Sequence, residues 1–157
     1  MIATIPKPQR RAKQPRQPIR SRGKAGSRTS RRRKLRTAKL HDADRLFSLF
    51  IRTRDDWQCK ACGRGQAQAV MQCAHIVSRR YRAVRWFPLN AVCLCAACHV
   101  SYTYDPIAWE DWVDDHYPGR LSMLKQVARA SAGAVDYDEV CCSLKSEMEV
   151  LRVRWTA

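Results

Sequence analysis

The sequence of 157 residues predicts an α+β fold, in which two short strands and a helix form a core with flanking helices and a basic N-terminal arm. Three observations predict this fold. Two Cys-x2-Cys pairs enclose a short segment, apolar residues recur at helical spacing on both sides of it, and positive charge gathers at the N-terminus. We expect an arm over residues 1–38, a core over 39–104 and a helical C-terminal extension over 105–157.

Positive charge is concentrated in the first forty residues. The formal net charge is +16, and residues 1–40 hold 15 of the 30 Lys and Arg residues without any Asp or Glu. Residues 41–157 carry 15 cations against 14 anions. A near-neutral body with a cationic arm is typical of a protein that holds a polyanion through a separate tether.

The arm has few apolar side chains, so we expect residues 1–38 to be disordered when free. Its densest cationic run should contact nucleic-acid phosphates. This run consists of Arg31, Arg32, Arg33 and Lys34, followed by Leu35 and Arg36. The alternative is a tail that only keeps the protein soluble or binds another partner.

The cysteines predict a zinc site. Cys59 and Cys62 precede Gly63, which is the usual order in a zinc knuckle, and a matching pair follows at Cys95 and Cys98. The alternative is a set of buried reduced thiols. The other four cysteines have no partner at ligand spacing and are expected to be small buried apolar residues. They are Cys73, Cys93, Cys141 and Cys142.

No stretch approaches eighteen consecutive apolar residues, and the N-terminus lacks the apolar core of a signal peptide. We therefore expect a cytoplasmic protein without a membrane segment. In that compartment eight cysteines favour metal binding over disulfides.

Hydrophobic periodicity places the elements around the cysteines. A helix is expected from about Lys39, strands over 69–77 and 90–94, and a short helix after Cys95. Further helices are expected over 106–117, over 120–130 and from a cap at 136–139 through Arg154. The last helix has an apolar stripe that would serve as core or as a subunit interface. It contains Val140, Leu144, Met148 and Leu151.

The segment between the two predicted strands mixes cations with aromatic residues. We expect its arginines to contact phosphates, whereas Trp86 is expected to pack inward. The arginines are Arg79, Arg80, Arg82 and Arg85, and Tyr81 lies among them.

Two histidines and an asparagine lie in order within the cysteine frame. Hydrolysis of a phosphodiester requires an activated water, a cation near the developing charge and a rigid scaffold. His75, on the first strand, would be the general base, and His99, on the helix after the last cysteine pair, would bind a divalent cation. Asn90 would hold the loop and orient His75 through its amide. The alternative for His75 is a buried core histidine. The alternative for His99 is a zinc ligand in place of Cys98, and that for Asn90 is a turn residue.

This frame resembles the HNH (ββα-metal) endonuclease superfamily. The segments "FSLFIRTRD" (47–55), "CKACG", "QCAHIVSRRY" (72–81) and "CLCAACH" are also similar to the NinG family of lambdoid phage recombination proteins. By position, His75 matches the catalytic histidine, Asn90 the middle residue and His99 the metal-ligand position. Ala74 stands where many HNH enzymes carry a further ligand, and His99 stands where NinG proteins carry asparagine.

The resemblance implies an endonuclease that requires Mg²⁺ or Mn²⁺, contains a structural Zn²⁺ and acts on branched DNA, such as Holliday junctions and D-loops. A phage protein of this kind would work in the bacterial host cytoplasm. Symmetric cleavage of a four-way junction needs two active sites, hence a possible homodimer. Two alternatives remain: an HNH nicking endonuclease of duplex DNA without branch preference, and a non-catalytic zinc module that binds DNA.

Overall fold

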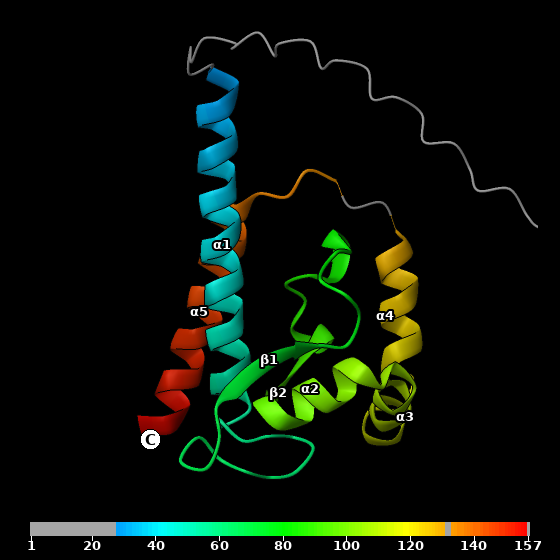
Figure 1. Cartoon of the computed structure of the whole chain (residues 1–157). Helices are drawn as coiled ribbons and strands as arrows, with labels where there is room; N and C mark the ends of the chain where they lie inside the picture. Colours follow the sequence, from blue (N-terminus) through cyan, green and yellow to red (C-terminus); the bar gives the residue numbers. More distant parts are fainter. Residues whose placement is uncertain (1–27, 131–132, 157) are drawn as a thin grey trace, which may run out of the picture.

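The computed structural model describes residues 28–130 and 133–156, and within these ranges it has five α-helices and one two-stranded sheet (Figure 1). This confirms the α+β class. The elements are α1 (Arg28–Arg54), β1 (Met71–His75), β2 (Ala91–Cys95), α2 (Ala96–Tyr104), α3 (Pro106–His116), α4 (Arg120–Arg129) and α5 (Tyr137–Thr156). None of the described helices is long and apolar enough to cross a membrane.

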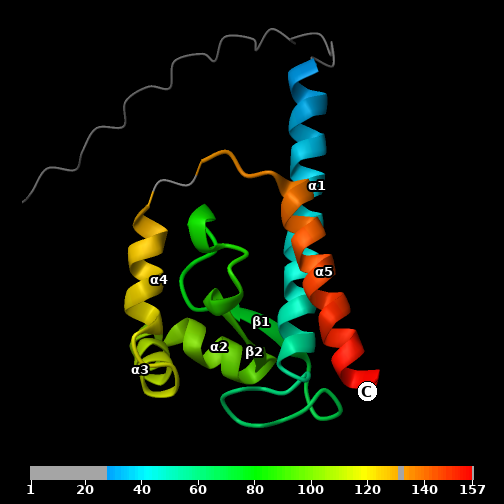
Figure 2. The ribbon, with the colours of Figure 1, turned by 180° about the vertical axis from the view of Figure 1, so that it is seen from behind.

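The first helix begins earlier than the sequence suggested. It starts at Arg28 rather than near Lys39, so the expectation of disorder was wrong for residues 28–38, while residues 1–27 lie outside the described part. A segment with few apolar residues cannot contribute to the core, but it can still form a helix, because Arg, Lys, Leu and Ala all have high helix propensity. Once residues 39–54 are helical, each further residue extends an existing helix and needs no new nucleus. The N-terminal half of α1 is exposed and extends beyond the other elements (Figures 1 and 2).

The two strands form an antiparallel pair that leads directly into α2. Met71 lies opposite Cys95 and His75 lies opposite Ala91. Both strands fall within a residue or two of the predicted positions. β1 ends at His75 because the chain then enters a loop that contains two 3-10 turns, Arg82–Val84 and Pro88–Asn90. Cys95 ends β2 and caps α2, since its Sγ accepts a hydrogen bond from Cys98 N at 3.5 Å.

The first and last helices lie side by side (Figure 2). Phe47, Phe50 and Ile51 of α1 pack with Ala91 of β2 and Leu144 of α5 in one buried cluster. The other members of the α5 stripe pack against the same cluster, so in this chain the stripe belongs to the core. They are Val140, Met148 and Leu151.

Helices α3 and α4 cover the loop between the strands. Pro106 opens α3, and the Asp105 carboxylate caps it by accepting a hydrogen bond from Ala108 N at 3.0 Å. Val113 of α3 and Leu124 of α4 are fully buried beside Val84 of the loop. The helices that the sequence assigned to an extension therefore share a core with the strand pair and its loop.

We predict that α5 contributes strongly to stability through Leu144, which is 3% exposed. Leu144→Ala should lower the free energy of unfolding by about 2–5 kcal/mol, because it removes buried methyl groups and leaves a cavity beside Phe47 and Phe50. Val150→Ala on the same helix is the matched control: Val150 is 71% exposed, and its truncation should change stability by no more than about 0.5 kcal/mol. Urea unfolding followed by circular dichroism measures both. Equal losses would contradict this packing.

Candidate functional site

Four cysteine side chains converge on one point. The sulfur atoms of Cys59, Cys62, Cys95 and Cys98 all lie within 4.8 Å of one another, and Cys62 Sγ is 3.8 Å from Cys95 Sγ. Four sulfurs arranged tetrahedrally around zinc, at about 2.3 Å from the ion, lie about 3.8 Å apart. The cluster therefore fits a zinc ion, as the spacing predicted.

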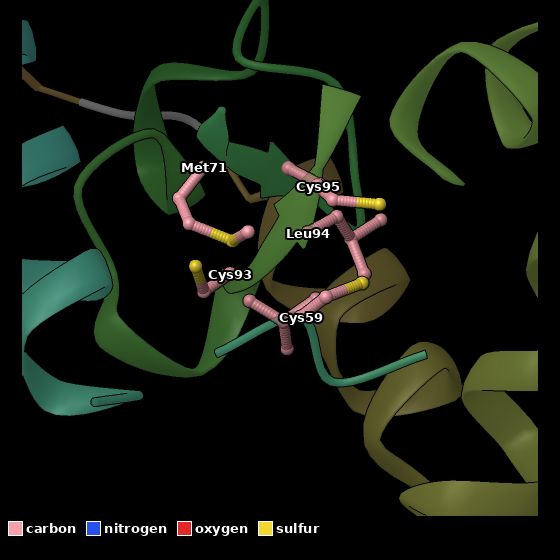
Figure 3. Packing of buried hydrophobic residues seen from close by; sticks show 7 residues of the cluster. Cys59, Met71, Cys93, Leu94 and Cys95 are labelled. Atoms are coloured by element: carbon pink, nitrogen blue, oxygen red, sulfur yellow. The ribbon is translucent and has the colours of Figure 1, made fainter. Parts of the chain in front are cut away.

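Local backbone structure brings the first pair to the second. Gly63 adopts a φ of 73°, and its N–H donates to Cys59 O at 2.8 Å, which closes the tight turn between Cys59 and Cys62. Lys60 N donates to Cys93 O at 2.9 Å and ties this turn to β2. Cys59 and Cys95 then lie in the same packed cluster as Met71, Cys93 and Leu94 (Figure 3).

The surroundings of the cluster favour the thiolate form of Cys59 and disfavour the thiolate form of Cys98. Burial alone would raise the pKa of Cys59, but hydrogen bonds from the backbone of Cys95, Cys62 and Ala61 lower it to about 7. The pKa of Cys98 is raised by burial and by the neighbouring thiols. Sharing a divalent cation would remove this conflict, because each ligand sulfur would then be deprotonated.

The two histidines predicted as catalytic line the same cavity. It measures about 530 Å³ and lies between α1, the end of β1 and α2. His75 and His99 both line it, and the other lining residues are Asp44, Phe47, Ser48, Cys73, Ser78, Arg79 and Thr103.

His75 lies at the end of β1 with a defined hydrogen bond. Its Nε2 is 3.0 Å from the carbonyl oxygen of Arg85. A carbonyl can only accept, so the neutral ring carries its proton on Nε2 and has an unprotonated Nδ1. Burial, which disfavours the imidazolium, lowers the pKa of His75, although the Arg85 carbonyl partly opposes this. The ring is therefore neutral near pH 7.

The His99 ring carries its proton on the other nitrogen, Nδ1. Its Nδ1 is 2.6 Å from Gln72 Oε1, so Nδ1 is the donor and Nε2 is the unprotonated nitrogen. Burial lowers the pKa of His99, which also favours the neutral ring. Because His99 bonds to Gln72 and lies outside the four-sulfur cluster, it does not take the place of Cys98 there.

Asn90 holds the loop that follows β1. It is fully buried: its Oδ1 accepts from Val77 N at 2.7 Å, and its Nδ2 donates to Val77 O at 2.9 Å and Val84 O at 2.8 Å. Asn90 therefore holds the loop, as the sequence predicted. The predicted bond from its amide to His75 is not formed, because the three partners of the amide are all backbone groups and His75 bonds to Arg85 O instead.

The arginines of the loop divide into two groups. Arg79 lines the cavity and is exposed, and Arg80 and Arg82 are exposed as well. Arg85, in contrast, forms a two-fold hydrogen-bonded ion pair with Asp44, at 2.9 Å from Nε and 2.6 Å from Nη2. This pairing differs from the phosphate contact expected for Arg85.

Asp44 is the site residue that sequence reasoning missed. It also accepts a hydrogen bond from Trp86 Nε1 at 3.0 Å, which confirms that Trp86 packs inward. Burial opposes ionisation of the Asp44 carboxyl, but the hydrogen bond and charge of Arg85 hold its pKa below the ordinary value. The only sequence signal was an acid near Asp42, among cations and apolar residues on the helix that precedes the cysteines.

The remaining cysteines lie in different places. Cys93 is fully buried, as expected, and Cys73 lines the cavity, where burial raises its pKa to about 12. The expectation of burial was wrong for Cys142, which is exposed. Cys142 lies two residues before Leu144, which places it on the opposite side of α5 from the buried stripe.

Comparison of the chain with protein-family models, with curated proteins and with solved structures gives no match.

We predict that the purified protein holds one zinc ion per chain. Cys62→Ser and Cys98→Ser should each abolish stoichiometric zinc, whereas Cys142→Ser, at an exposed cysteine outside the cluster, should retain it. Structural zinc contributes about 10–16 kcal/mol of binding free energy, so a chelator should unfold the strand pair. Elemental analysis and far-UV circular dichroism measure the two effects. A full zinc content in Cys62→Ser would show that the four sulfurs are not the site.

Proposed function

We propose that this chain is a metal-dependent DNA endonuclease of the HNH (ββα-metal) class, most similar in its motifs to the NinG family. One observation carries the proposal: His75 and His99 line a single cavity on a strand–strand–helix unit that four cysteines hold together. The unprotonated nitrogens inferred for the two rings fit the two roles, a general base and a metal ligand.

His75 acts as the general base in this proposal. Its unprotonated Nδ1 takes a proton from a water molecule, and the resulting hydroxide attacks the phosphorus atom in line with the leaving oxygen. The P–O bond to that oxygen then breaks, and the oxygen takes a proton from solvent. The lowered pKa of His75 keeps the base available at neutral pH.

His99 is the protein ligand that the cavity offers to Mg²⁺ or Mn²⁺. When bound, such a cation stabilises the negative charge that develops on the phosphate oxygens. His99 fits the role because Gln72 occupies its Nδ1, so Nε2 is unprotonated. Ala74 is 2% exposed and offers no ligand, and the Asp44 oxygens are engaged by Arg85 and Trp86. Water and phosphate oxygens would complete the coordination, as is common for Mg²⁺.

Cations beside the cavity support DNA as the substrate. Arg79 lines the cavity, Arg80 and Arg82 are exposed in the same loop, and the N-terminal half of α1 carries a dense run of exposed cations. Such side chains bind phosphates without reading sequence. The preference for branched DNA, such as Holliday junctions or D-loops, rests on the resemblance to the NinG family, and symmetric junction cleavage would require a homodimer.

The proposal predicts Mg²⁺- or Mn²⁺-dependent cleavage that depends on His75. His75→Ala should lower the cleavage rate by about 10²–10⁴-fold, because it removes the general base, while DNA binding stays within about twofold. His41→Ala is the matched control: His41 is exposed on α1 and should be dispensable. Cleavage of end-labelled DNA and fluorescence anisotropy measure the two quantities.

Two outcomes would contradict the proposal at different levels. Binding without metal-dependent cleavage by the wild type would make the chain a non-catalytic zinc module. Equal cleavage of a four-way junction and of a linear duplex with the same sequence would favour a nicking endonuclease and exclude the branch preference.

We also predict that the exposed half of α1 contributes to DNA affinity through charge. Changing four cations to Gln should lower the slope of log affinity against log salt by up to about 3.6, or about 0.9 per lost phosphate contact. The four are Arg31, Arg32, Arg33 and Lys34. Anisotropy titrations at several salt concentrations measure the slope.

The control variant removes the same charge from exposed positions elsewhere. It carries Gln at Lys60, Arg64, Arg129 and Lys145. A slope that falls equally in both variants would mean that α1 acts only through the net charge of the protein.

A further inference from the structure

The His75 ring packs against Phe47, with ring centroids 5.5 Å apart, and forms a hydrogen bond with one main-chain group. The Arg85 carbonyl lies 3.0 Å from Nε2 and decides which ring nitrogen carries the proton. Arg85 lies just after a short 3-10 turn, and its own N–H makes a long hydrogen bond of 3.3 Å to Arg82 O. The position of this carbonyl therefore needs support from outside the loop.

The Arg85 side chain supplies that support. Its Nε and Nη2 donate to the two oxygens of Asp44, at 2.9 Å and 2.6 Å, and its Nη1 donates to Arg79 O at 3.2 Å. A two-fold bond between guanidinium and carboxylate fixes the plane of both groups. The pair is well shielded from water, with side-chain exposures of 17% for Arg85 and 24% for Asp44, so solvent weakens it little.

Asp44 is itself well anchored. It lies on α1, between the buried residues Ala43 and Phe47, and it also accepts the Trp86 indole N–H at 3.0 Å. Trp86 in turn packs edge-on against Tyr137 of α5, with ring centroids 5.7 Å apart. One carboxylate thus holds two consecutive loop residues against the rigid pair of helices.

We propose that Asp44 is a positioning residue for His75: its carboxylate fixes Arg85, whose carbonyl keeps the His75 ring in the Nε2-protonated form. The catalytic meaning of this role rests on the proposed function. The orientation of the ring does not, because it is a property of the folded protein.

Asp44 also contributes to the charge around His75. The charged and titratable groups around the ring are Asp44 from α1, Cys73 from β1, Arg79 and Arg85 from the loop, and His99 from α2. The Asp44 carboxylate raises the pKa of His75, whereas burial and the two arginines lower it. Removal of the carboxylate charge should therefore shift the His75 titration to lower pH.

The test compares Asp44→Asn with Asp42→Asn, which removes the same charge from an exposed position on the same helix. Nitrogen-15 NMR of the histidine rings should show one Nε2-protonated form for His75 in the wild type and in Asp42→Asn. In Asp44→Asn it should show a mixture of the two neutral forms and a lower pKa. In the cleavage assay kcat should fall by about 10–100-fold, with KM within about threefold, as is typical when an orienting partner is lost.

A second variant separates positioning from misfolding. Arg85→Gln keeps the backbone carbonyl and the Asp44 charge but removes the ion pair. Because both residues act through one link, the double variant Asp44→Asn/Arg85→Gln should lose no more activity than the worse single variant. Additive losses, or a wild-type ring form in both folded single variants, would overturn the inference. If Asp44→Asn does not fold, the ring form in Arg85→Gln decides.

The two proposals fail separately. If the wild type cleaves no DNA but the ring form changes in Asp44→Asn, the positioning role stands and the proposed nuclease falls. If the wild type cleaves DNA and the ring form is unchanged in both folded single variants, the proposed nuclease stands and the positioning role falls.

Discussion

The convergence of four cysteines is the constraint on which the strand–strand–helix unit depends. An isolated pair of five-residue strands is marginally stable in water, and no third strand joins this pair within residues 28–130 and 133–156. The cysteines join the turn before β1 to the end of β2 and the first turn of α2. Since β1 carries His75 and α2 carries His99, the group that stabilises the hairpin also sets where the two rings lie. A metal held by these cysteines would therefore be part of the scaffold, and none of the four lines the cavity.

Helix α1 provides a second support on the other side of the strands. At its C-terminal end Arg54 donates to Pro88 O at 2.6 Å and Ala91 O at 2.9 Å, and buried Asp55 accepts from Cys93 N at 2.7 Å. Arg54 and Asp55 also pair with each other at 2.8 Å, and since each of them bonds to β2, this end of the helix is firmly attached to the strand. Three turns earlier, Asp44 holds Arg85. The helix thus fixes the second half of the loop between the strands, at Arg85 and Trp86 and again at Pro88.

Local signals in the sequence predicted much of this arrangement. The cysteine spacing predicted the cluster of four sulfurs, Asp105 with Pro106 predicted the start of α3, and apolar periodicity predicted the face of α1 that holds Phe47 and Phe50. The bond between Arg85 and Asp44 was not predictable, because the two residues lie 41 positions apart and neither has a distinctive neighbour. The role of Asn90 was predicted in part: its buried amide holds the loop, but a main-chain carbonyl, which no sequence pattern reveals, orients His75.

The helical state of residues 28–38 changes how positive charge can act on the cavity. A disordered tether only raises the local concentration of DNA near the protein. Here Arg33 and Asp44 belong to one continuous helix, and a rise of 1.5 Å per residue puts them about 16 Å apart along its axis. Phosphates bound at Arg33 would therefore have a fixed distance and direction from a cavity that Asp44 lines. In a disordered arm only the charge of this run would matter, whereas in a helix its position along the axis matters as well.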